Sequence, residues 1–204
     1  MVAKEIAHSL TPEDQQILAD ILLLYEDIDR QTLNFARQTG LHCKPSCGAC
    51  CENPNIETTL PEVLPLAVYL WSRSQAKHTL EIIQSNKSGG ICVFYHPFAD
   101  AKGQGGCRVY AYRPGLCRLF GFSMRCDKHG EPLLMTCKII KESQAHAYCQ
   151  AQQLHHGAPL LSDHFLRVFN IDPVGGQKFL WINQAVGLAL EKVGFYMALE
   201  KMKQ

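Results

Sequence analysis

Four of the ten cysteines lie within nine residues, in the segment Cys43-Lys44-Pro45-Ser46-Cys47-Gly48-Ala49-Cys50-Cys51. A hydrophobic core can use a buried cysteine as a small apolar residue, but this segment also holds Pro, Gly, Ser and Lys, which do not fill a core. Short loops with Gly or Pro allow successive thiolates to point toward one metal ion. The segment therefore predicts metal ligation by cysteine sulfur.

The four clustered cysteines are not expected to complete a metal site alone. Cys47 and Cys50 have the spacing of a metal-binding knuckle, whereas the adjacent side chains of Cys50 and Cys51 should diverge. Both members of that pair are not expected to bind one ion in unstrained tetrahedral geometry. One should face a second metal, a bridging position or the core. Further ligands are then needed, and the sequence offers Cys92, Cys107, Cys117, Cys126 and Cys137.

A second block pairs sulfur with cations, in Cys107-Arg108-Val109-Tyr110 and Arg113-Pro114-Gly115-Leu116-Cys117-Arg118. Arg113 and Arg118 are candidate cofactor-binding residues, because a guanidinium can offset thiolate charge or hold a carboxylate or phosphate through its planar fork. The Pro-Gly pair favours a turn that would aim Cys117 at the site. The alternative is a surface turn with solvated arginines.

The charge balance excludes some functions. Lysine and arginine number 20 against 19 aspartates and glutamates, a formal net charge of +1, so we do not expect nucleic acid as a partner. The N-terminal segment lacks the apolar core of a signal peptide, and no apolar run is long enough for a membrane span. We expect a cytoplasmic protein whose thiols stay reduced, which favours metal or redox chemistry over disulfides.

Helices are expected on both sides of the cysteine loop. Thr11 and Pro12 favour a helix start and Gly40 a helix end, which predicts a helix between them. Its expected buried face comprises Ile17, Ile21, Leu24, Ile28, Leu33 and Phe35. The capping pair Thr59 and Glu62 predicts a second helix, from about Thr59 to Asn86, which Ser88-Gly89-Gly90 would end.

The rest of the chain completes a mainly α fold. Between Ile91 and Lys138, glycines and prolines divide short apolar pieces, which predicts loops with short strands. Further helices are expected from Ile139 to about His155, from Pro159 to Asn170 and from Pro173 to Lys201, with Gly187 and Gly194 as points of close packing in the last. We predict a single domain, 1–204, whose terminal helices pack around an irregular cysteine-rich metal-binding centre at 41–118, or 41–137 in its longer form.

Several motifs, taken in order, resemble the CxxCxxCC family, also called YkgJ-like, a zinc- or iron-chelating domain. They are Cys43, Cys47, Cys50, Cys51, the helix-opening Glu62, Cys92, Cys107-Arg108-Val109-Tyr110, Arg113-Pro114 and Cys117-Arg118. The resemblance covers roughly residues 41–118. One departure is that three residues, not two, separate Cys43 from Cys47, which leaves open whether Cys43 has the role of the family's first cysteine.

The leading hypothesis is a metal-binding protein with a redox or metal-handling role. Its predicted ligands are Cys43, Cys47, Cys50, Cys51, Cys92, Cys107 and Cys117. Thiolates suit both zinc and iron–sulfur clusters. We favour an iron–sulfur cluster because the candidate ligands are spread over many loops and no second Cys-x-x-Cys pair is present; zinc is the alternative.

Two further hypotheses remain open. Flagellin lysine methylases, regarded as iron–sulfur proteins that use S-adenosylmethionine, have a related cysteine pattern, which suggests an iron–sulfur-dependent enzyme such as a protein methylase relative. However, the chain has no G-x-G-x-x-G turn of the common methyl-donor type. The other hypothesis is a structural zinc module that serves as a scaffold for a protein client, and metal removal would unfold it.

The remaining cysteines and histidines carry weaker expectations. Cys126 and Cys137 flank the turn Asp127-Lys128-His129-Gly130, and a hairpin there could bring both sulfurs to one site, so their role as ligands is left open. Cys149 is expected to be a buried apolar residue of a helix. His155-His156 favours a solvated loop, whereas His42 and His96 lie nearer to cysteines and are better candidate ligands.

Overall fold

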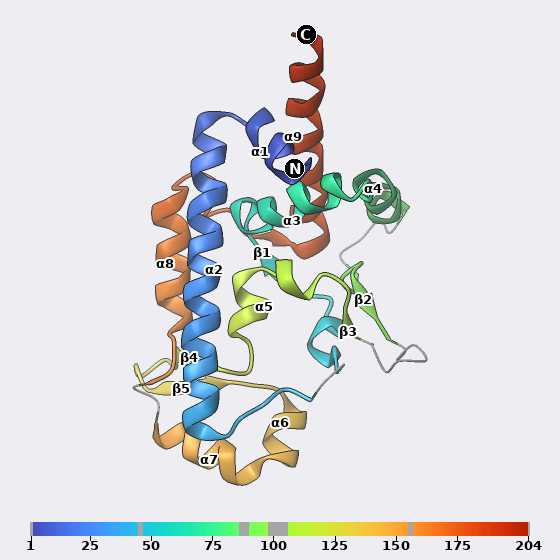
Figure 1. Ribbon diagram of the computed structural model, residues 1–204. Helices are drawn as coiled ribbons and strands as arrows, with labels where there is room; N and C mark the ends of the chain where they lie inside the picture. Colours follow the sequence, from blue (N-terminus) through green and yellow to red (C-terminus); the bar gives the residue numbers. More distant parts are fainter. Residues whose placement is uncertain (1, 45–46, 86–89, 98–105, 155–156, 204) are drawn as a thin grey trace.

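The computed structural model describes residues 2–44, 47–85, 90–97, 106–154 and 157–203 (Figure 1). Within these residues, α-helices dominate and the strands are two to four residues long. The strands form separate antiparallel pairs, β1 with β6, β2 with β3 and β4 with β5. The predicted fold class, mainly α with short strands in an irregular cysteine-rich region, is confirmed.

The α-helices are α1 (Val2–Ser9), α2 (Pro12–Thr39), α3 (Leu60–Ser72), α4 (Ala76–Ser85), α5 (Gly115–Leu119), α6 (Lys138–Ser143), α7 (Ala145–Gln153), α8 (Leu161–Ile171) and α9 (Ile182–Met202). The 3-10 helices that lie wholly within the described residues are η1 (Ala49–Glu52) and η2 (Tyr110–Tyr112). The strands are β1 (Glu57–Thr58), β2 (Tyr95–His96), β3 (Gly106–Cys107), β4 (Ser123–Cys126), β5 (Pro132–Met135) and β6 (Leu180–Trp181).

The long helix α2 begins and ends where the sequence predicts. The Thr11 hydroxyl accepts a hydrogen bond from the Asp14 backbone N–H at 3.1 Å, and Gly40 ends the helix in the left-handed region with φ 74°. The expected buried face is confirmed at Ile17, Ile21, Leu24, Ile28 and Phe35. Leu33 is an exception, because it follows Ile28 by five residues and so turns away from that face, where it is 50% exposed.

Two clusters of buried side chains lie along α2. The larger cluster joins the first half of α2 to α1, α3 and α9. The smaller cluster surrounds Phe35 and Leu41, where the end of α2 meets β4, β5, α6 and α7. Figure 1 shows α8 running beside α2, with the irregular segments η1, β2, β3 and α5 on the other side. The cysteine-rich region is thus held between two groups of helices.

Two expected helices are each divided into two in the structure, and a third is present as expected. The helix predicted from Thr59 to Asn86 is divided into α3 and α4, because Ser74 at the break adopts φ 58°, which no helix continues. The helix predicted from Ile139 is divided into α6 and α7 at Gln144. The expected short helix at 159–170 is present as α8.

The last helix begins later than the sequence predicts. Residues after Asp172 form a turn in which its Oδ1 accepts backbone hydrogen bonds from Val174 and Gly175, at 3.1 and 2.8 Å. Strand β6 then pairs with β1, so α9 starts only at Ile182. Helix α1 is an addition that the sequence argument did not contain.

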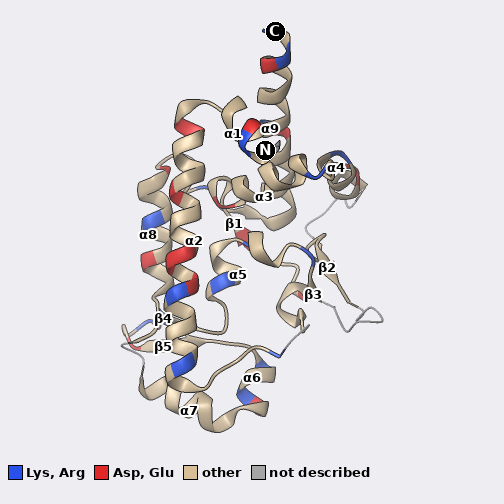
Figure 2. Ribbon diagram, in the orientation of Figure 1, with Lys and Arg blue, Asp and Glu red and all other residues tan. Residues whose placement is uncertain are grey.

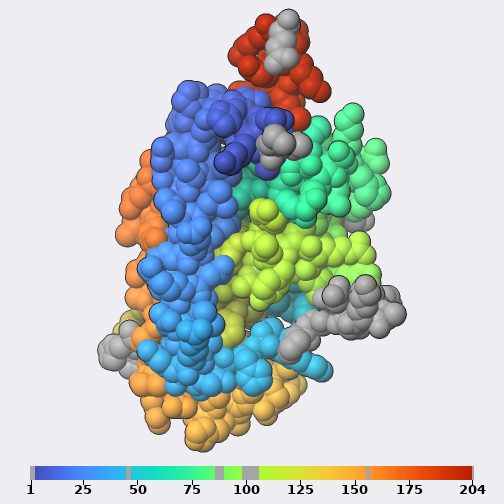
Figure 3. Space-filling view, viewed as in Figure 1, coloured from blue at the N-terminus to red at the C-terminus, as the bar shows by residue number. Residues whose placement is uncertain are grey.

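Charged residues of both signs are interspersed along the helices (Figure 2), in agreement with the nearly balanced composition. Figure 3 shows that the C-terminal end of α9 stands out from the rest of the molecule. Among the described helices, none combines the length and apolarity that crossing a membrane requires.

Replacing each of the two glycines of α9 by alanine should change the stability of the protein in opposite directions. A Cβ at Gly194 would lie 2.6 Å from Cζ2 of Trp71, whose indole N–H donates to Leu190 O, whereas a Cβ at Gly187 would meet Ile83 at 3.6 Å, an ordinary contact. We predict that Gly194→Ala lowers the free energy of unfolding by about 1–2 kcal/mol, since overpacking outweighs helix propensity. Gly187→Ala should raise it by about 0.5–1 kcal/mol. Urea titration measures both, and equal effects would contradict this packing.

Candidate metal centre

The cysteine loop starts from a fixed point at the end of α2. Leu41 is buried in the smaller cluster, and the next residue, His42, exchanges two hydrogen bonds with the side chain of Gln144. The His42 N–H donates to Gln144 Oε1 at 2.9 Å, and Gln144 Nε2 donates to His42 O at 2.7 Å. Because Gln144 joins α6 to α7, these bonds fix the start of the loop against both helices.

Two glycines bring the cysteine loop against the β2–β3 pair. Gly48 adopts φ 56° just before η1, in the left-handed region that favours glycine. A Cβ added at Gly48 would lie 2.7 Å from Gly106 Cα and 2.8 Å from Tyr95 Cε2. No larger residue fits, so glycine at position 48 permits both the turn and the approach of the two backbones.

A side-chain hydrogen bond holds η1 in this position. The Tyr95 hydroxyl donates to Glu52 Oε1 at 2.6 Å, and Tyr95 pairs with Cys107 across the two strands. Since η1 carries Cys50 and Cys51, these contacts place both residues next to the strand that carries Cys107.

Cys92 is positioned by the last helix. Asn183, near the start of α9, accepts a hydrogen bond from the Val93 N–H at 3.0 Å and donates to Ile91 O at 3.1 Å. Its amide therefore fixes the backbone on both sides of Cys92. The Cys92 side chain is buried. The backbone carbonyl of Cys92 accepts a hydrogen bond from the Tyr95 N–H at 2.9 Å, which connects Cys92 to β2.

The buried carboxylate of Glu62 positions α5, the helix that carries Cys117. Glu62 Oε2 accepts from the Thr58 hydroxyl, the Thr59 N–H and the Thr59 hydroxyl, at 3.1, 3.1 and 2.9 Å. Glu62 Oε1 accepts from the Gly115 N–H at 3.0 Å and from His164 Nε2 at 2.9 Å. All five hydrogen bonds point toward the carboxylate, so the predicted capping residue also fixes the first residue of α5.

His164 is a residue of this region that the sequence argument missed. It lies on α8 and only 3% of its surface is exposed. A Cβ at Gly115 would be 2.1 Å from His164 Cε1, so the imidazole packs directly on the start of α5. A single histidine in an amphipathic helix gives no sequence signal for such a contact.

The cysteines predicted to be metal ligands influence the pKa values of one another's thiols. Burial is the largest influence on four of them and raises the pKa of each: Cys43, Cys92, Cys107 and Cys117. At Cys92 the pKa is about 11. Negative charge on Cys50 raises the pKa of all four further, and Cys47 acts in the same way on Cys43. Cys50 is therefore within electrostatic range of cysteines from several separate segments.

Cys50 and Cys51 differ from the sequence expectation. Their adjacent side chains were expected to diverge, but the 3-10 geometry of η1 brings the two thiols into a hydrogen bond. This bond lowers the pKa of Cys50 to about 6, and it raises the pKa of Cys51 above its ordinary value. The nearby guanidinium of Arg113 lowers the pKa of Cys50 further.

The two candidate arginines have different surroundings. Arg113 lies over the Tyr110 ring, 3.6 Å from its centroid, and lowers the pKa of Cys43, Cys107 and Cys117 as well as that of Cys50. Arg118 is buried, and its donors are directed to acceptors of the fold: Arg113 O at 2.8 Å, Ala111 O and the Asp29 carboxylate. Arg113 is thus the cation beside the thiols, whereas Arg118 holds the backbone between Ala111 and Arg113, which leads into α5.

The last three cysteines lie in different surroundings. The predicted hairpin is present as β4–β5, but Cys126 pairs with Pro132 next to the turn, whereas Cys137 follows β5 at the opposite end. The hairpin thus keeps the two sulfurs apart. Cys137 caps α6 and raises the pKa of Cys43, so it lies beside the centre, whereas Cys126 is exposed. Cys149 is exposed on α7, so its expected burial is wrong.

Two histidine predictions can be located and one cannot. His42 is exposed, with Nδ1 3.2 Å from Gly40 O, and His96 lies in β2 opposite Gly106. The pair His155-His156 lies outside the described residues.

The donor set fits a thiophilic metal in its chemistry. Seven thiols from four segments, with a guanidinium beside them, influence one another's pKa, and thiolates bind zinc and iron–sulfur clusters. Across the described part of the chain, no three His, Cys, Asp or Glu side chains are arranged so that they could already hold a metal ion. Binding would therefore require cysteine side chains to reorient toward a shared centre.

Comparison with known proteins supports the same chemistry. A family model described as "CxxCxxCC: Putative zinc- or iron-chelating domain" matches residues 42–153, more than half of the chain. The match extends beyond the motifs to the end of α7, and leaves α8 and α9 outside. No curated protein and no solved structure matches the chain.

We predict that Glu62→Gln destabilises the fold by about 2–4 kcal/mol at neutral pH. Glutamine keeps one acceptor oxygen and places an amide donor against groups that already donate, and each buried unsatisfied group costs about 1–3 kcal/mol. The matched control is Glu26→Gln, which removes the same charge from an exposed site on α2. Urea unfolding at neutral pH measures both, and equal stability of the two variants would contradict the role of Glu62.

The ionisation of Glu62 also predicts how the stability of the fold depends on pH. Burial alone would raise the pKa of Glu62, but hydrogen bonds and charge from His164, together with the Thr59 hydrogen bonds, outweigh burial and lower it. A lowered folded-state pKa stabilises the fold above the unfolded pKa of about 4.3, and this contribution is lost as the pH falls below that value. The stability of the native protein should therefore fall more steeply below about pH 4.3 than that of Glu62→Gln. Parallel curves in acid would show that Glu62 does not contribute in this way.

Proposed function

The chain belongs to the CxxCxxCC family, described as a putative zinc- or iron-chelating domain, and from this premise we propose that its clustered cysteines hold an iron–sulfur cluster. The proposed ligands come from Cys43, Cys47, Cys50, Cys51, Cys92, Cys107 and Cys117. Zinc is the alternative occupant, because four thiolates also suit that ion.

One observation carries the proposal: the cysteine loop packs directly on the β2–β3 pair, where a Cβ at Gly48 would lie 2.7 Å from Gly106 Cα, and this brings η1 with Cys50 and Cys51 beside Cys107. In agreement with this packing, negative charge on Cys50 raises the thiol pKa of cysteines in the loop, before β2, in β3 and in α5. These segments lie far apart in the sequence and each is fixed by its own contact, as described for Gln144, Gly48, Asn183 and Glu62. Sulfurs supplied by many segments favour a cluster over a compact zinc knuckle.

The protein's own groups have distinct parts in this proposal. The cysteines would supply thiolates, and Arg113 would offset part of their negative charge. Arg118 would act on the turn that aims Cys117, not on a bound cofactor. When bound, an iron–sulfur cluster supplies one-electron redox chemistry.

The proposed setting is a single cytoplasmic domain. All ten cysteines are free, as expected where thiols stay reduced. Helix α2 contributes to both clusters of buried residues, which supports one folding unit for the whole chain. The role that follows from a redox-active centre in this setting is electron transfer or metal handling.

The identity of the metal is tested by anaerobic purification, followed by an absorption spectrum and by iron, zinc and acid-labile sulfide analysis of one sample. We expect a coloured protein with comparable iron and sulfide and with absorbance that reductant bleaches reversibly. A colourless protein with stoichiometric zinc would replace the redox role with a structural zinc module. Protein that carries neither metal after anaerobic preparation would contradict metal binding.

The ligand set is tested by serine substitutions. We predict that Cys47→Ser and Cys117→Ser each weaken metal binding at least about tenfold, because the loss of a ligand should cost no less than the loss of an outer partner. Cys149→Ser and Cys126→Ser remove exposed thiols on α7 and β4 and should leave metal content unchanged. Metal per chain, measured after competition with a chelator, makes the comparison. Equal losses in all four variants would refute the assignment.

A further inference from the structure

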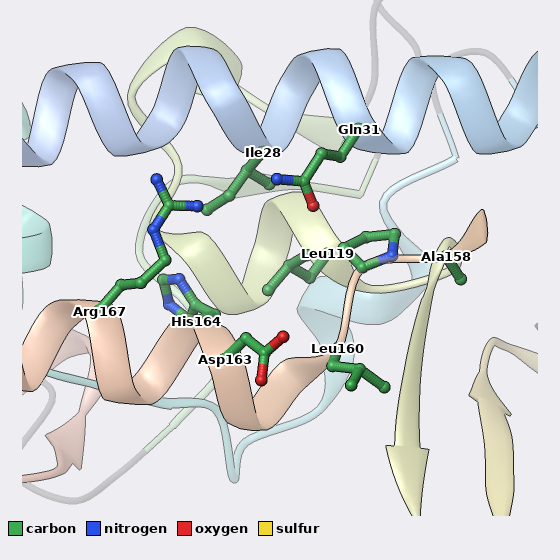
Figure 4. A pocket seen from close by; sticks show the side chains of 9 residues that line it. Ile28, Gln31, Leu119, Ala158, Leu160, Asp163, His164 and Arg167 are labelled. Carbon is green, nitrogen blue, oxygen red and sulfur yellow. The ribbon is translucent and has the colours of Figure 1, made fainter. Parts of the chain in front are cut away.

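A second candidate site lies between α2 and α8. The structure has a cavity of about 320 Å³ there, and Ile28, Leu119 and Leu160 form part of its apolar wall. At about 30 Å³ per water molecule, this volume holds a ligand of about ten non-hydrogen atoms. Figure 4 shows Arg167 extending from α8 toward α2, and Gln31 extending from α2 into the space between the two helices. No cysteine is among the described residues of the wall.

The wall contains a buried polar group without a partner. Only 1% of the His164 side chain is exposed, and its Nδ1 has no hydrogen-bond partner within the described residues, whereas its Nε2 lies 2.9 Å from Glu62 Oε1. Burial alone would raise the pKa of Glu62, but the hydrogen bond and charge of His164 lower it, so a carboxylate faces an imidazolium. An imidazolium carries a proton on each ring nitrogen. Nδ1 is therefore a buried donor that lacks an acceptor, which is costly.

A second positive charge at the cavity is only partly neutralised. Arg167 lies three residues after His164 on α8, and its Nη1 donates to Asp27 Oδ2 at 2.5 Å. The other oxygen of Asp27 accepts from Arg30, so one carboxylate serves two guanidinium groups. A guanidinium has five N–H donors, and in the described part of the chain only Nη1 of Arg167 has a partner. Gln31 Nε2 donates to Asp27 Oδ2 at 2.8 Å and keeps a second N–H.

The acidic side chain of the wall is at its exposed edge. Among the described residues that line the cavity, Asp163 alone is acidic, and it is exposed, so water and salt screen its charge. The deeper wall presents donors, those of His164, Arg167 and Gln31. A ligand that suits this wall must accept hydrogen bonds and carry negative charge.

We propose that this cavity binds a small organic carboxylate. A carboxylate accepts hydrogen bonds and donates none, so its two oxygens match the Nδ1–H of His164 and the unused N–H groups of Arg167. The planar fork of a guanidinium also suits the shape of a carboxylate. The hydrocarbon part of the ligand lies against Ile28, Leu119 and Leu160. Because the described wall contains no cysteine, occupation of the cavity does not depend on the proposed metal.

Titration with sodium hexanoate, in a buffer free of other carboxylates and of phosphate, tests the proposal on the full chain as purified. At about pH 7 hexanoate is ionised, because its pKa resembles that of a glutamate side chain. Calorimetry should show saturable binding. In ¹⁵N NMR spectra, both ring nitrogens of His164 should carry protons, and the Nδ1 signal should shift with the same dissociation constant. 1-Hexanol, which lacks the charge, should bind at least about tenfold more weakly, the loss expected for a charge-assisted hydrogen bond.

Three substitutions locate the binding. Arg167→Gln should weaken hexanoate binding about fivefold or more, since it removes a partly exposed cation and keeps an amide donor. Arg37→Gln is the matched control, an exposed arginine of α2 that does not line the cavity, and should change affinity less than about twofold. Asp163→Asn should strengthen binding by about two- to fivefold, because it removes a like charge from the exposed edge. Thermal unfolding verifies that all three variants are folded.

Other outcomes overturn the proposal. Equal binding of 1-hexanol would make the cavity a merely apolar site. Equal binding of inorganic phosphate, which has no hydrocarbon part, would make it a general anion site. A His164 Nδ1 without a proton in the hexanoate complex, weaker binding by Asp163→Asn, or the absence of saturable binding would show that the cavity holds no carboxylate.

Discussion

The arrangement of the cysteine region depends on one buried carboxylate, that of Glu62. Its two oxygens accept hydrogen bonds from the start of α3, the start of α5 and the imidazole of His164 on α8. Its backbone carbonyl also accepts a hydrogen bond from the Tyr25 hydroxyl on α2. A buried charge is tolerated only when it is fully hydrogen-bonded, and this carboxylate is satisfied by groups from α5, α8 and the segment before α3. The relative positions of α2, α3, α5 and α8 are therefore coupled to one residue, Glu62.

This coupling matters because the candidate ligands are dispersed. Cys117 follows Gly115, which Glu62 holds, and Arg118 then closes the turn onto Arg113. Cys50 and Cys107 approach each other only because Gly48 and Gly106 permit backbone contact. An irregular segment has few hydrogen bonds of its own, so the surrounding helices supply the contacts that position the thiols. Cysteines 74 residues apart in sequence, Cys43 and Cys117, can then contribute to one centre.

The features that sequence predicts well are local. The caps Thr11 and Thr59, the helix end at Gly40 and the dense cysteine segment each depend on residues a few positions apart, and the structure contains all of them. The break at Ser74 was missed because nothing in the apolar spacing marks a left-handed residue. The Glu62–His164 bond joins residues 102 positions apart, and the cavity beside it has no sequence signature. The exposure of Cys149 likewise depends on which face of α7 packs inward, which tertiary contacts decide.

The central claim is that sulfur from several segments surrounds one metal centre. X-ray absorption at the edge of the bound metal tests this claim most directly, because it identifies the nearest neighbours of the metal. We expect only sulfur in the nearest shell of the metal, at about 2.3 Å if the metal is zinc, and a changed sulfur shell in Cys117→Ser. A shell with mostly nitrogen or oxygen neighbours, or one that Cys117→Ser leaves unchanged, would contradict it.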